Sequence, residues 1–156
     1  MKSVLAGALS AALLGLSLTA QAEAVSPEDQ IKLRQAGYSY MSWNMGKIKA
    51  QVIDQSVAYN QAQVAAAANT LAAIASSGMG ALYGPGTERS VGDRVTRVKP
   101  EMFDNFDDVA AISARLNETT GALASAAASG DQAAIRVAFG DVGQTCKSCH
   151  DKYRQK

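Results

Sequence analysis

The amino-acid sequence predicts an all-α protein, an antiparallel four-helix bundle with a long crossover loop between helices 2 and 3. Apolar residues recur at intervals of three and four in four separate segments, which is the period of an amphipathic helix. Residues typical of helix starts precede these segments, and no segment alternates as a strand does. Four amphipathic helices bury their apolar sides together in a bundle.

The first two predicted helices start after Ser26 and Asn60, both typical N-cap residues. Pro27 suits the first helical position, and an acidic residue follows two positions later. The expected apolar side of the first helix comprises Ile31, Tyr38, Met41, Met45, Ile48 and Val52. That of the second comprises Val64, Ala67, Ala68, Leu71, Ile74 and Ala75, and Gly78 is expected to end this helix.

Residues 78–99 are rich in glycine and then in charge, which predicts the long crossover loop. Loops of this length in compact domains are more often functional than idle, and Thr96 and Arg97 are expected to reach a cofactor. Pro100 is expected to start the third helix. The apolar side of this helix comprises Phe103, Phe106, Val109, Ala110, Leu116 and Leu123.

Asp131 is the expected N-cap of the fourth helix. Its inward side comprises Ile135, Ala138, Phe139, Val142, Cys146, Cys149, His150 and Tyr153. Gly140 and Gly143 each cost about 1 kcal/mol in a helix interior relative to alanine. The cost is understandable if a flat ring or another backbone approaches the helix there.

Residues 146–150 read Cys-Lys-Ser-Cys-His, the C-x-x-C-H pattern of covalent c-type haem attachment. Residues three and four apart share one helix face, so Cys146, Cys149 and His150 point towards one flat ligand, with His150 placed to bind the iron. A thioredoxin-like redox pair belongs to a βαβ context, and a zinc site needs a fourth ligand. The sequence has no other cysteine or histidine, and a plain disulfide does not explain His150.

Residues 1–22 are expected to be a signal peptide, cleaved after Ala20-Gln21-Ala22, with residues 23–156 forming one domain. The alternative is a retained membrane anchor, although the apolar run is short and rich in alanine. Export predicts a periplasmic protein, with no membrane attachment after cleavage. Without Lys2, basic and acidic residues balance, which excludes a nucleic-acid binder.

Basic residues outnumber acidic ones at the C-terminal end of the chain, where Lys147, Lys152, Arg154 and Lys156 accompany Asp151. This excess has two interpretations. It could complement the dipole of the last helix, or it could form a positive rim around an exposed haem edge.

Arg34 lies on the inward side of the first helix, where an arginine is costly without a partner. A haem propionate is the expected partner, and the alternative is a side chain that reaches solvent. The sixth iron position cannot be a second histidine. Tyr38 is one candidate for that side, as a neutral phenol that shields the iron, and Met41, Met45, Met79 and Met102 are the candidates for a methionine ligand.

These residues, together with Tyr83-Gly84-Pro85-Gly86-Thr87 and the run from Ala138 to Gly143, resemble cytochrome c prime of purple sulfur bacteria. The similarity spans the whole mature chain. It implies a periplasmic, usually dimeric bundle with one covalent haem c per chain and a five-coordinate, high-spin iron. The resemblance places Tyr38 at the distal position, and Arg34 and Gln35 in the pair that contacts the haem. It places Arg154 near the proximal face. Arg97 is also expected at the haem, although its match to the family is less direct because the crossover varies in length.

The expected function is therefore binding of nitric oxide (NO) or carbon monoxide (CO) at an open iron site, together with electron transfer to an unidentified periplasmic redox partner. If the distal helix also forms the dimer contact, ligand binding is expected to weaken it. The alternative is a six-coordinate His/Met electron carrier. An enzyme such as a peroxidase is not expected, because the mature chain has no second histidine to act as an acid or base near the iron.

Overall fold

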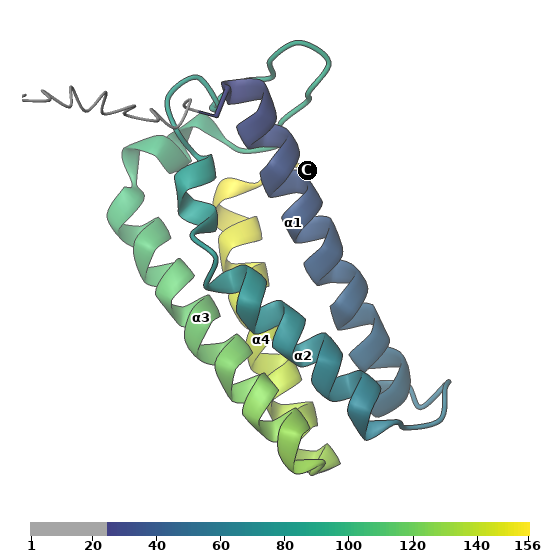
Figure 1. Ribbon diagram of the computed structural model, residues 1–156. Coiled ribbons are helices and arrows are strands. Elements are labelled where there is room, and N and C mark those ends of the chain that lie inside the picture. The colour runs from purple at the N-terminus through teal and green to yellow at the C-terminus, as the bar shows by residue number, and fades with distance from the viewer. Residues whose placement is uncertain (1–24) are drawn as a thin grey trace, which may run out of the picture.

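The computed structural model describes residues 25–156, which fold into a bundle of four α-helices (Figure 1). The helices are α1 (Pro27–Ile48), α2 (Gln61–Ala75), α3 (Phe106–Ser129) and α4 (Gln132–Tyr153). They run alternately up and down, and the long crossover joins α2 to α3 across one end of the bundle. The all-α prediction is confirmed. The predicted signal peptide lies outside the described residues.

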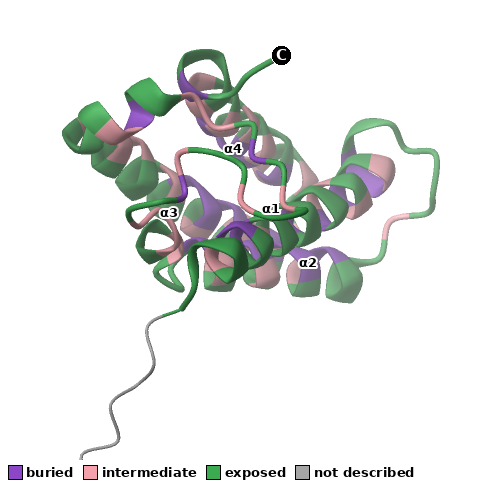
Figure 2. Ribbon diagram, turned by 90° about the horizontal axis from the view of Figure 1, so that it is seen from above, coloured by how far each residue is buried: buried purple, intermediate pink, exposed green. Residues whose placement is uncertain are grey.

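The core lies along the sides of the helices that face one another, as a view down the bundle shows (Figure 2). Burying these side chains is the main favourable contribution to folding. The fully buried large side chains include Ile31, Ile48, Val52, Val64, Leu71, Leu123, Ile135 and Val142. All of these were expected on the apolar sides of the four helices.

The three predicted N-caps are confirmed. The Ser26 hydroxyl accepts a hydrogen bond from the Asp29 amide at 3.1 Å, and the Asn60 side chain accepts one from the Gln63 amide at 3.0 Å. Asp131 Oδ1 accepts from two amides at the start of α4, at 2.9 and 3.2 Å. Each cap satisfies backbone donors that have no partner within the helix.

Replacing Asp131 with alanine is expected to lower the free energy of unfolding by about 1 kcal/mol, since α4 loses the acceptor for its first amides. Urea denaturation measures this loss. Asp141→Ala is the matched control, because the Asp141 side chain is exposed in mid-helix and makes no hydrogen bond among the described residues. Equal losses in the two variants would contradict the capping role.

The predicted start of the third helix is wrong. Pro100–Asp104 form a short 3-10 helix, η3, and Asn105 interrupts the helical backbone with φ −130° and ψ 41° before α3 begins at Phe106. The interruption changes the direction in which the following side chains point. Phe106 is therefore 50% exposed rather than buried, and its ring meets that of Phe103 edge to face at 5.9 Å.

The end of α1 also differs from a simple helix. A π-helical turn, η1 (Lys49–Ile53), follows α1 and buries Gln51. Gln51 Oε1 accepts from the Asn60 amide at 2.8 Å, and its Nε2 donates to Gln63 Oε1 at 3.2 Å. This side chain therefore links the end of α1 to the start of α2.

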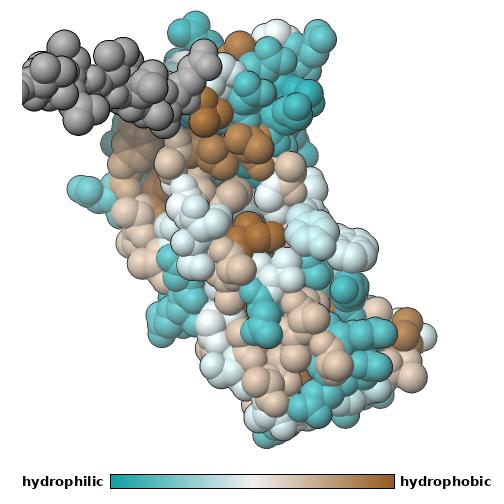
Figure 3. All heavy atoms as spheres, in the orientation of Figure 1, coloured by the Kyte–Doolittle hydropathy of each residue, from teal (hydrophilic) through white to brown (hydrophobic). Residues whose placement is uncertain are grey.

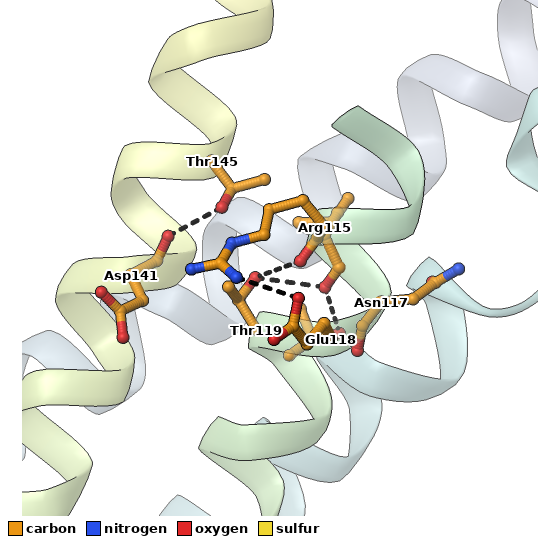
Figure 4. A network of polar contacts seen from close by, with 8 residues as sticks. Arg115, Asn117, Glu118, Thr119, Asp141 and Thr145 are labelled. Carbon is orange, nitrogen blue, oxygen red and sulfur yellow. Dashed lines mark hydrogen bonds and ion pairs between the residues drawn. The ribbon is translucent and has the colours of Figure 1, made fainter. Parts of the chain in front are cut away.

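Threonine hydroxyls in the packed faces of α3 and α4 are satisfied within their own helices (Figure 4). Thr119 donates to the Arg115 carbonyl at 3.0 Å, and Thr145 donates to the Asp141 carbonyl at 2.9 Å. Both side chains are buried, so an unsatisfied hydroxyl would be costly. The two helices can consequently pack together without polar bonds between these residues.

The crossover begins with another 3-10 helix, η2 (Met79–Leu82), which precedes η3 in the chain. Its N-cap is Gly78, with φ +83°. Helix α2 ends at Ala75, three residues before the expected glycine stop. The described chain has only two isolated β-bridges, Val91 with Arg94 and Val98 with Arg154. Among residues 25–156, no helix has the length and apolar character needed to span a membrane.

Candidate haem site

Helix α4 presents the two cysteines and the histidine of the C-x-x-C-H motif near its C-terminal end. Both cysteines are free thiols and partly buried, and burial raises the pKa of each. His150 is exposed. Partial burial lowers the pKa of His150, and the positive charges of Arg154 and Arg97 lower it further. Its imidazole is therefore favoured in the neutral form, which is the form that binds a metal.

Tyr38 of α1 lies near enough to the two thiols to interact with them electrostatically, although it is 40% exposed rather than fully turned into the core. Burial of its phenol raises the pKa of Tyr38, and the nearby Cys149 and Cys146 raise it further. The interaction with the Tyr83 hydroxyl and the charge of Arg34 act in the opposite direction on this pKa. Tyr38 is therefore a neutral phenol near the cysteines, with a second tyrosine beside it.

Tyr83 is a site residue that the sequence analysis did not assign. It lies where η2 ends, its pKa is raised mainly by burial, and the interaction with Tyr38 adds to this increase. The Arg34 guanidinium lies 4.5 Å from the centre of its ring, a cation–π distance. The Tyr-Gly-Pro-Gly sequence around it predicts a turn, but only the fold brings that turn to α1.

Arg34 is only 2% exposed, which excludes the side chain that reaches solvent. Its guanidinium donates four hydrogen bonds to the crossover: to the Leu82 carbonyl at 3.1 Å, to Thr87 Oγ1 and the Thr87 carbonyl at 2.9 Å each, and to Thr96 Oγ1 at 2.8 Å. The crossover thus supplies partners for the buried charge. The expected contact with a haem propionate stays a prediction, and Nε–H is the donor that has no acceptor among residues 25–156.

Gln35, the other member of the predicted pair, also bonds to the crossover. Its Nε2 donates to the Val95 carbonyl at 2.6 Å, and the residue is exposed. Arg34 and Gln35 therefore bind the crossover to the N-terminal half of α1.

The structure brings Arg97 and Arg154 together beside the last turn of α4. Val98 and Arg154 form an antiparallel bridge, and Arg97 donates to the Gln155 carbonyl at 2.8 Å. Both arginines are exposed, and both influence the pKa of His150. Two residues that are 57 positions apart in the sequence thus lie on the histidine side of the site.

Asp108 of α3 anchors the end of α4 through two contacts. Tyr153 Oη donates to Asp108 Oδ2 at 2.6 Å, and Lys152 Nζ donates to Oδ1 at 2.9 Å. The hydrogen bond from Tyr153 lowers the pKa of Asp108, and Lys152 lowers it further. The same contact raises the pKa of Tyr153 to about 12.

These shifts predict a pH dependence of stability. Because the folded pKa of Asp108 lies below its unfolded value of 3.8, the stabilisation is fully present above that value and is lost as the pH falls through the folded pKa. Tyr153→Phe removes the largest cause, so the variant is expected to lose less stability than the wild type between pH 5 and about pH 2. Urea denaturation at each pH gives the free energy of unfolding, and its slope against pH is compared between the two proteins.

Asp107→Asn is the matched control for this prediction, because the neighbouring carboxylate makes no side-chain hydrogen bond among the described residues. It should leave the acid dependence as it is in the wild type. Parallel slopes for the wild type and Tyr153→Phe would contradict the assigned role of the Asp108 contact.

The residues around the motif fit a flat group held between α1 and α4. In the described chain α1 packs on α2, α2 on α3 and α3 on α4, whereas the backbones of α1 and α4 lie further apart and their side chains meet in the shared core. Gly143 lies on the same helix face as Cys146 and His150, and a β-carbon added there would meet no atom within 4 Å. The expectation of a close backbone near Gly140 or Gly143 is therefore wrong for the described chain.

The comparisons with known proteins agree with this geometry. The family profile described as cytochrome C' matches residues 29–154 of the chain. The chain belongs to the cytochrome c′ family. Cytochromes c′ are haem c proteins without enzymatic activity, and they are typically periplasmic.

The similarity to individual cytochromes c′ extends over nearly the whole chain. The protein is 56% identical to cytochrome c′ of Allochromatium vinosum, with all of both chains covered. A solved cytochrome c′ described as having an unusual ligand-controlled dimer dissociation is 60% identical, with a TM-score of 0.81 over 84% of this chain and 98% of that one. Cytochrome c′ from Thermochromatium tepidum is 56% identical, also with a TM-score of 0.81, over 85% and 99% of the two chains.

More distant members of the family have been solved with gases bound. Variants of cytochrome c′ from Alcaligenes xylosoxidans, 32% identical to this chain, have structures as a nitric oxide complex and with carbon monoxide bound. Their TM-scores are 0.73 and 0.74, and they cover 84% and 86% of this chain. Binding of nitric oxide and carbon monoxide therefore occurs within the family.

Proposed function

We propose that this cytochrome c′ carries one haem c, joined by thioether bonds to Cys146 and Cys149, with His150 as the axial iron ligand. The two free thiols and the neutral imidazole on one face of α4 support the assignment, as does the open space at Gly143. When bound, the haem supplies an iron that changes between the ferric and ferrous states and takes a small axial ligand.

The single observation that carries the proposed gas binding is the position of Tyr38. The side chain from α1 that lies near the thiols is a neutral phenol, which is a poor iron ligand. The sequence holds no second histidine. Met41 and Met102 are buried, Met45 packs against the core, and Met79 lies against Gly37. A five-coordinate, high-spin iron is thus favoured over the His/Met alternative.

Tyr38 and Tyr83 would also set the selectivity of the site. The two phenols interact with each other, and Arg34 lies against Tyr83, so a ligand that reaches the iron must displace Tyr38 from this cluster. The cost of that displacement disfavours weak ligands such as dioxygen. Nitric oxide and carbon monoxide bind ferrous iron strongly enough to meet this cost, and relatives have been solved with both.

Covalent attachment is tested by mass spectrometry of the purified, denatured holoprotein. The wild type is expected to carry the mass of one haem, and the double variant Cys146→Ser/Cys149→Ser is expected to carry none. The control is Ser148→Ala, which changes the motif only between the cysteines and is expected to carry the haem as the wild type does. Haem retained by the double serine variant after denaturation would overturn the proposed attachment.

The proposed location is the periplasm, with residues 1–22 as the cleaved signal peptide. Electron exchange with an unidentified periplasmic redox partner is part of the proposal. Exposed basic residues near His150, such as Arg97 and Arg154, give that end of the molecule a positive surface. This supports the positive rim, although Lys147 is paired with Asp151 and Lys152 with Asp108.

The proposed homodimer would use an exposed apolar face of α1 that comprises Leu33, Tyr40 and Trp43. These side chains are 47%, 51% and 56% exposed, and they recur at intervals of seven and three. The rings of Tyr40 and Trp43 stack at 5.3 Å, with Lys47 4.5 Å from the centre of the Trp43 ring. Figure 3 views the molecule from the side of α1 and α2 and shows hydrophilic residues at both the upper and the lower end of this side.

Trp43→Glu is expected to weaken the dimer at least about thirtyfold, because large aromatic residues at the centre of an interface often contribute 2 kcal/mol or more. Sedimentation velocity measures the dissociation constant. Val137→Glu is the matched control, since Val137 is 69% exposed on α4 and lies outside this face. Equal dissociation constants for Trp43→Glu and the wild type would contradict the proposed interface.

A further inference from the structure

The crossover returns to the bundle as a short extended segment, residues 96–99, which we name the strap. The strap pairs with residues 152–155, immediately beyond His150. The Lys99 amide donates to the Tyr153 carbonyl at 2.9 Å, and the Gln155 amide donates to the Arg97 carbonyl at 2.7 Å. Lys99 Nζ adds a bond to the Lys152 carbonyl at 2.9 Å. The strap therefore bonds the C-terminal end of α4 along its length.

The first residue of the strap is bonded to α1. Arg34 donates to Thr96 Oγ1 at 2.8 Å, and the same oxygen accepts from the Val98 amide at 3.3 Å. Arg34 and Thr96 are 2% and 8% exposed, so water cannot readily replace this bond. One hydroxyl oxygen thus joins a buried arginine of α1 to the backbone of the strap.

The two sets of bonds connect opposite sides of the haem site. Arg34 lies against Tyr83 and influences the pKa of Tyr38, the tyrosines on the α1 side. The strap bonds the chain within two to five residues of His150, and Arg154 closes α4 by donating its amide to the His150 carbonyl at 3.1 Å. The strap therefore bonds both α1 and the end of α4, and connects the two helices at this end of the bundle.

We infer that the Arg34–Thr96 hydrogen bond positions His150, because it fixes the strap to α1 and the strap holds the last turn of α4. Thr96 is a positioning residue that acts through the strap and does not touch the iron ligand. Asp108 holds the same turn from α3, so loss of the Thr96 contact would shift the turn rather than unfold it. The inference rests on His150 as the iron ligand, which is part of the proposed function.

The test compares Thr96→Val with the wild type in two measurements on the ferrous holoprotein. Valine keeps the shape of threonine but cannot accept the hydrogen bond from Arg34. Amide hydrogen exchange is expected to become about tenfold faster at Lys99 and Gln155, whose N–H groups bridge the strap and the C-terminal end of α4. The iron–histidine stretching band in the resonance Raman spectrum is expected to shift or broaden.

Two further variants separate positioning from general destabilisation. Thr96→Ser keeps the hydroxyl and is expected to restore both the exchange rates and the Raman band. Thr120→Val removes another buried hydroxyl, which bonds the Leu116 carbonyl within α3 at 2.7 Å, and is expected to change neither measurement beyond its effect on global stability.

Unchanged exchange at Lys99 and Gln155 in Thr96→Val would overturn the inference, because Thr96 would not hold the strap. Faster exchange with an unchanged iron–histidine band would overturn it too, since the strap would not position His150. If the wild type shows no iron–histidine band, the proposed ligation by His150 fails, and the inference about His150 fails with it. The exchange rates then decide separately whether Thr96 holds the strap.

Discussion

Replacing Arg34 with methionine is expected to lower the free energy of unfolding of the holoprotein by about 3 kcal/mol. Methionine keeps the unbranched apolar stem of the side chain but lacks the guanidinium, so four hydrogen bonds to the crossover are lost. The Thr87 and Thr96 hydroxyls are buried, so their oxygens lose a donor where water has little access. Urea denaturation followed by circular dichroism measures the loss.

Arg115→Met is the matched control for Arg34→Met. Arg115 is exposed on α3 and pairs with Glu118 at 2.9 Å, a surface contact worth about 1 kcal/mol or less. Arg34→Lys should recover only a small part of the loss, because an ammonium group cannot reproduce the fixed fork of the guanidinium. If Arg34→Met and Arg115→Met are equally stable, the crossover does not depend on the buried arginine.

Tyr38→Ala is expected to raise the affinity of the ferrous holoprotein for carbon monoxide at least about tenfold. The ligand would no longer have to displace a phenol that interacts with Tyr83, and a tenfold change corresponds to about 1.4 kcal/mol. Optical titration with carbon monoxide measures the affinity.

Tyr83→Phe separates the steric effect of Tyr38 from the effect of its interaction with the Tyr83 hydroxyl. It keeps Tyr38 in place as a bulky group but removes the Tyr83 hydroxyl, which interacts with Tyr38. A smaller increase in affinity than in Tyr38→Ala is therefore expected. If Tyr38→Ala binds carbon monoxide as the wild type does, Tyr38 does not shield the iron.

The fold was largely predictable from sequence because its determinants are local. N-caps such as Asp131 and apolar positions such as Ile135 follow from short-range rules of helix formation. The start of α3 was not predictable in this way. A proline followed by an acidic residue favours a helix start, and only the backbone at Asn105 shows that this first turn is a separate 3-10 helix. Phe106 is exposed as a consequence.

The candidate site was predictable in part for a different reason. Cys146, Cys149 and His150 are close in sequence, so helical geometry alone puts them on one face. The partners of Arg34 lie 48 to 62 residues away, in a loop whose path no periodic pattern describes. An arginine on an apolar helix side indicated that a buried partner exists. It did not indicate that the partner is the crossover, nor that Tyr83 comes with it.

The absorption spectrum of the ferrous holoprotein, recorded with and without carbon monoxide, tests the central claim most directly. An open iron site with His150 on one side and Tyr38 on the other predicts a five-coordinate, high-spin spectrum that changes when carbon monoxide is added. A sharp low-spin spectrum that carbon monoxide leaves unchanged would contradict the claim, since it would mean that a side chain such as a methionine occupies the sixth position.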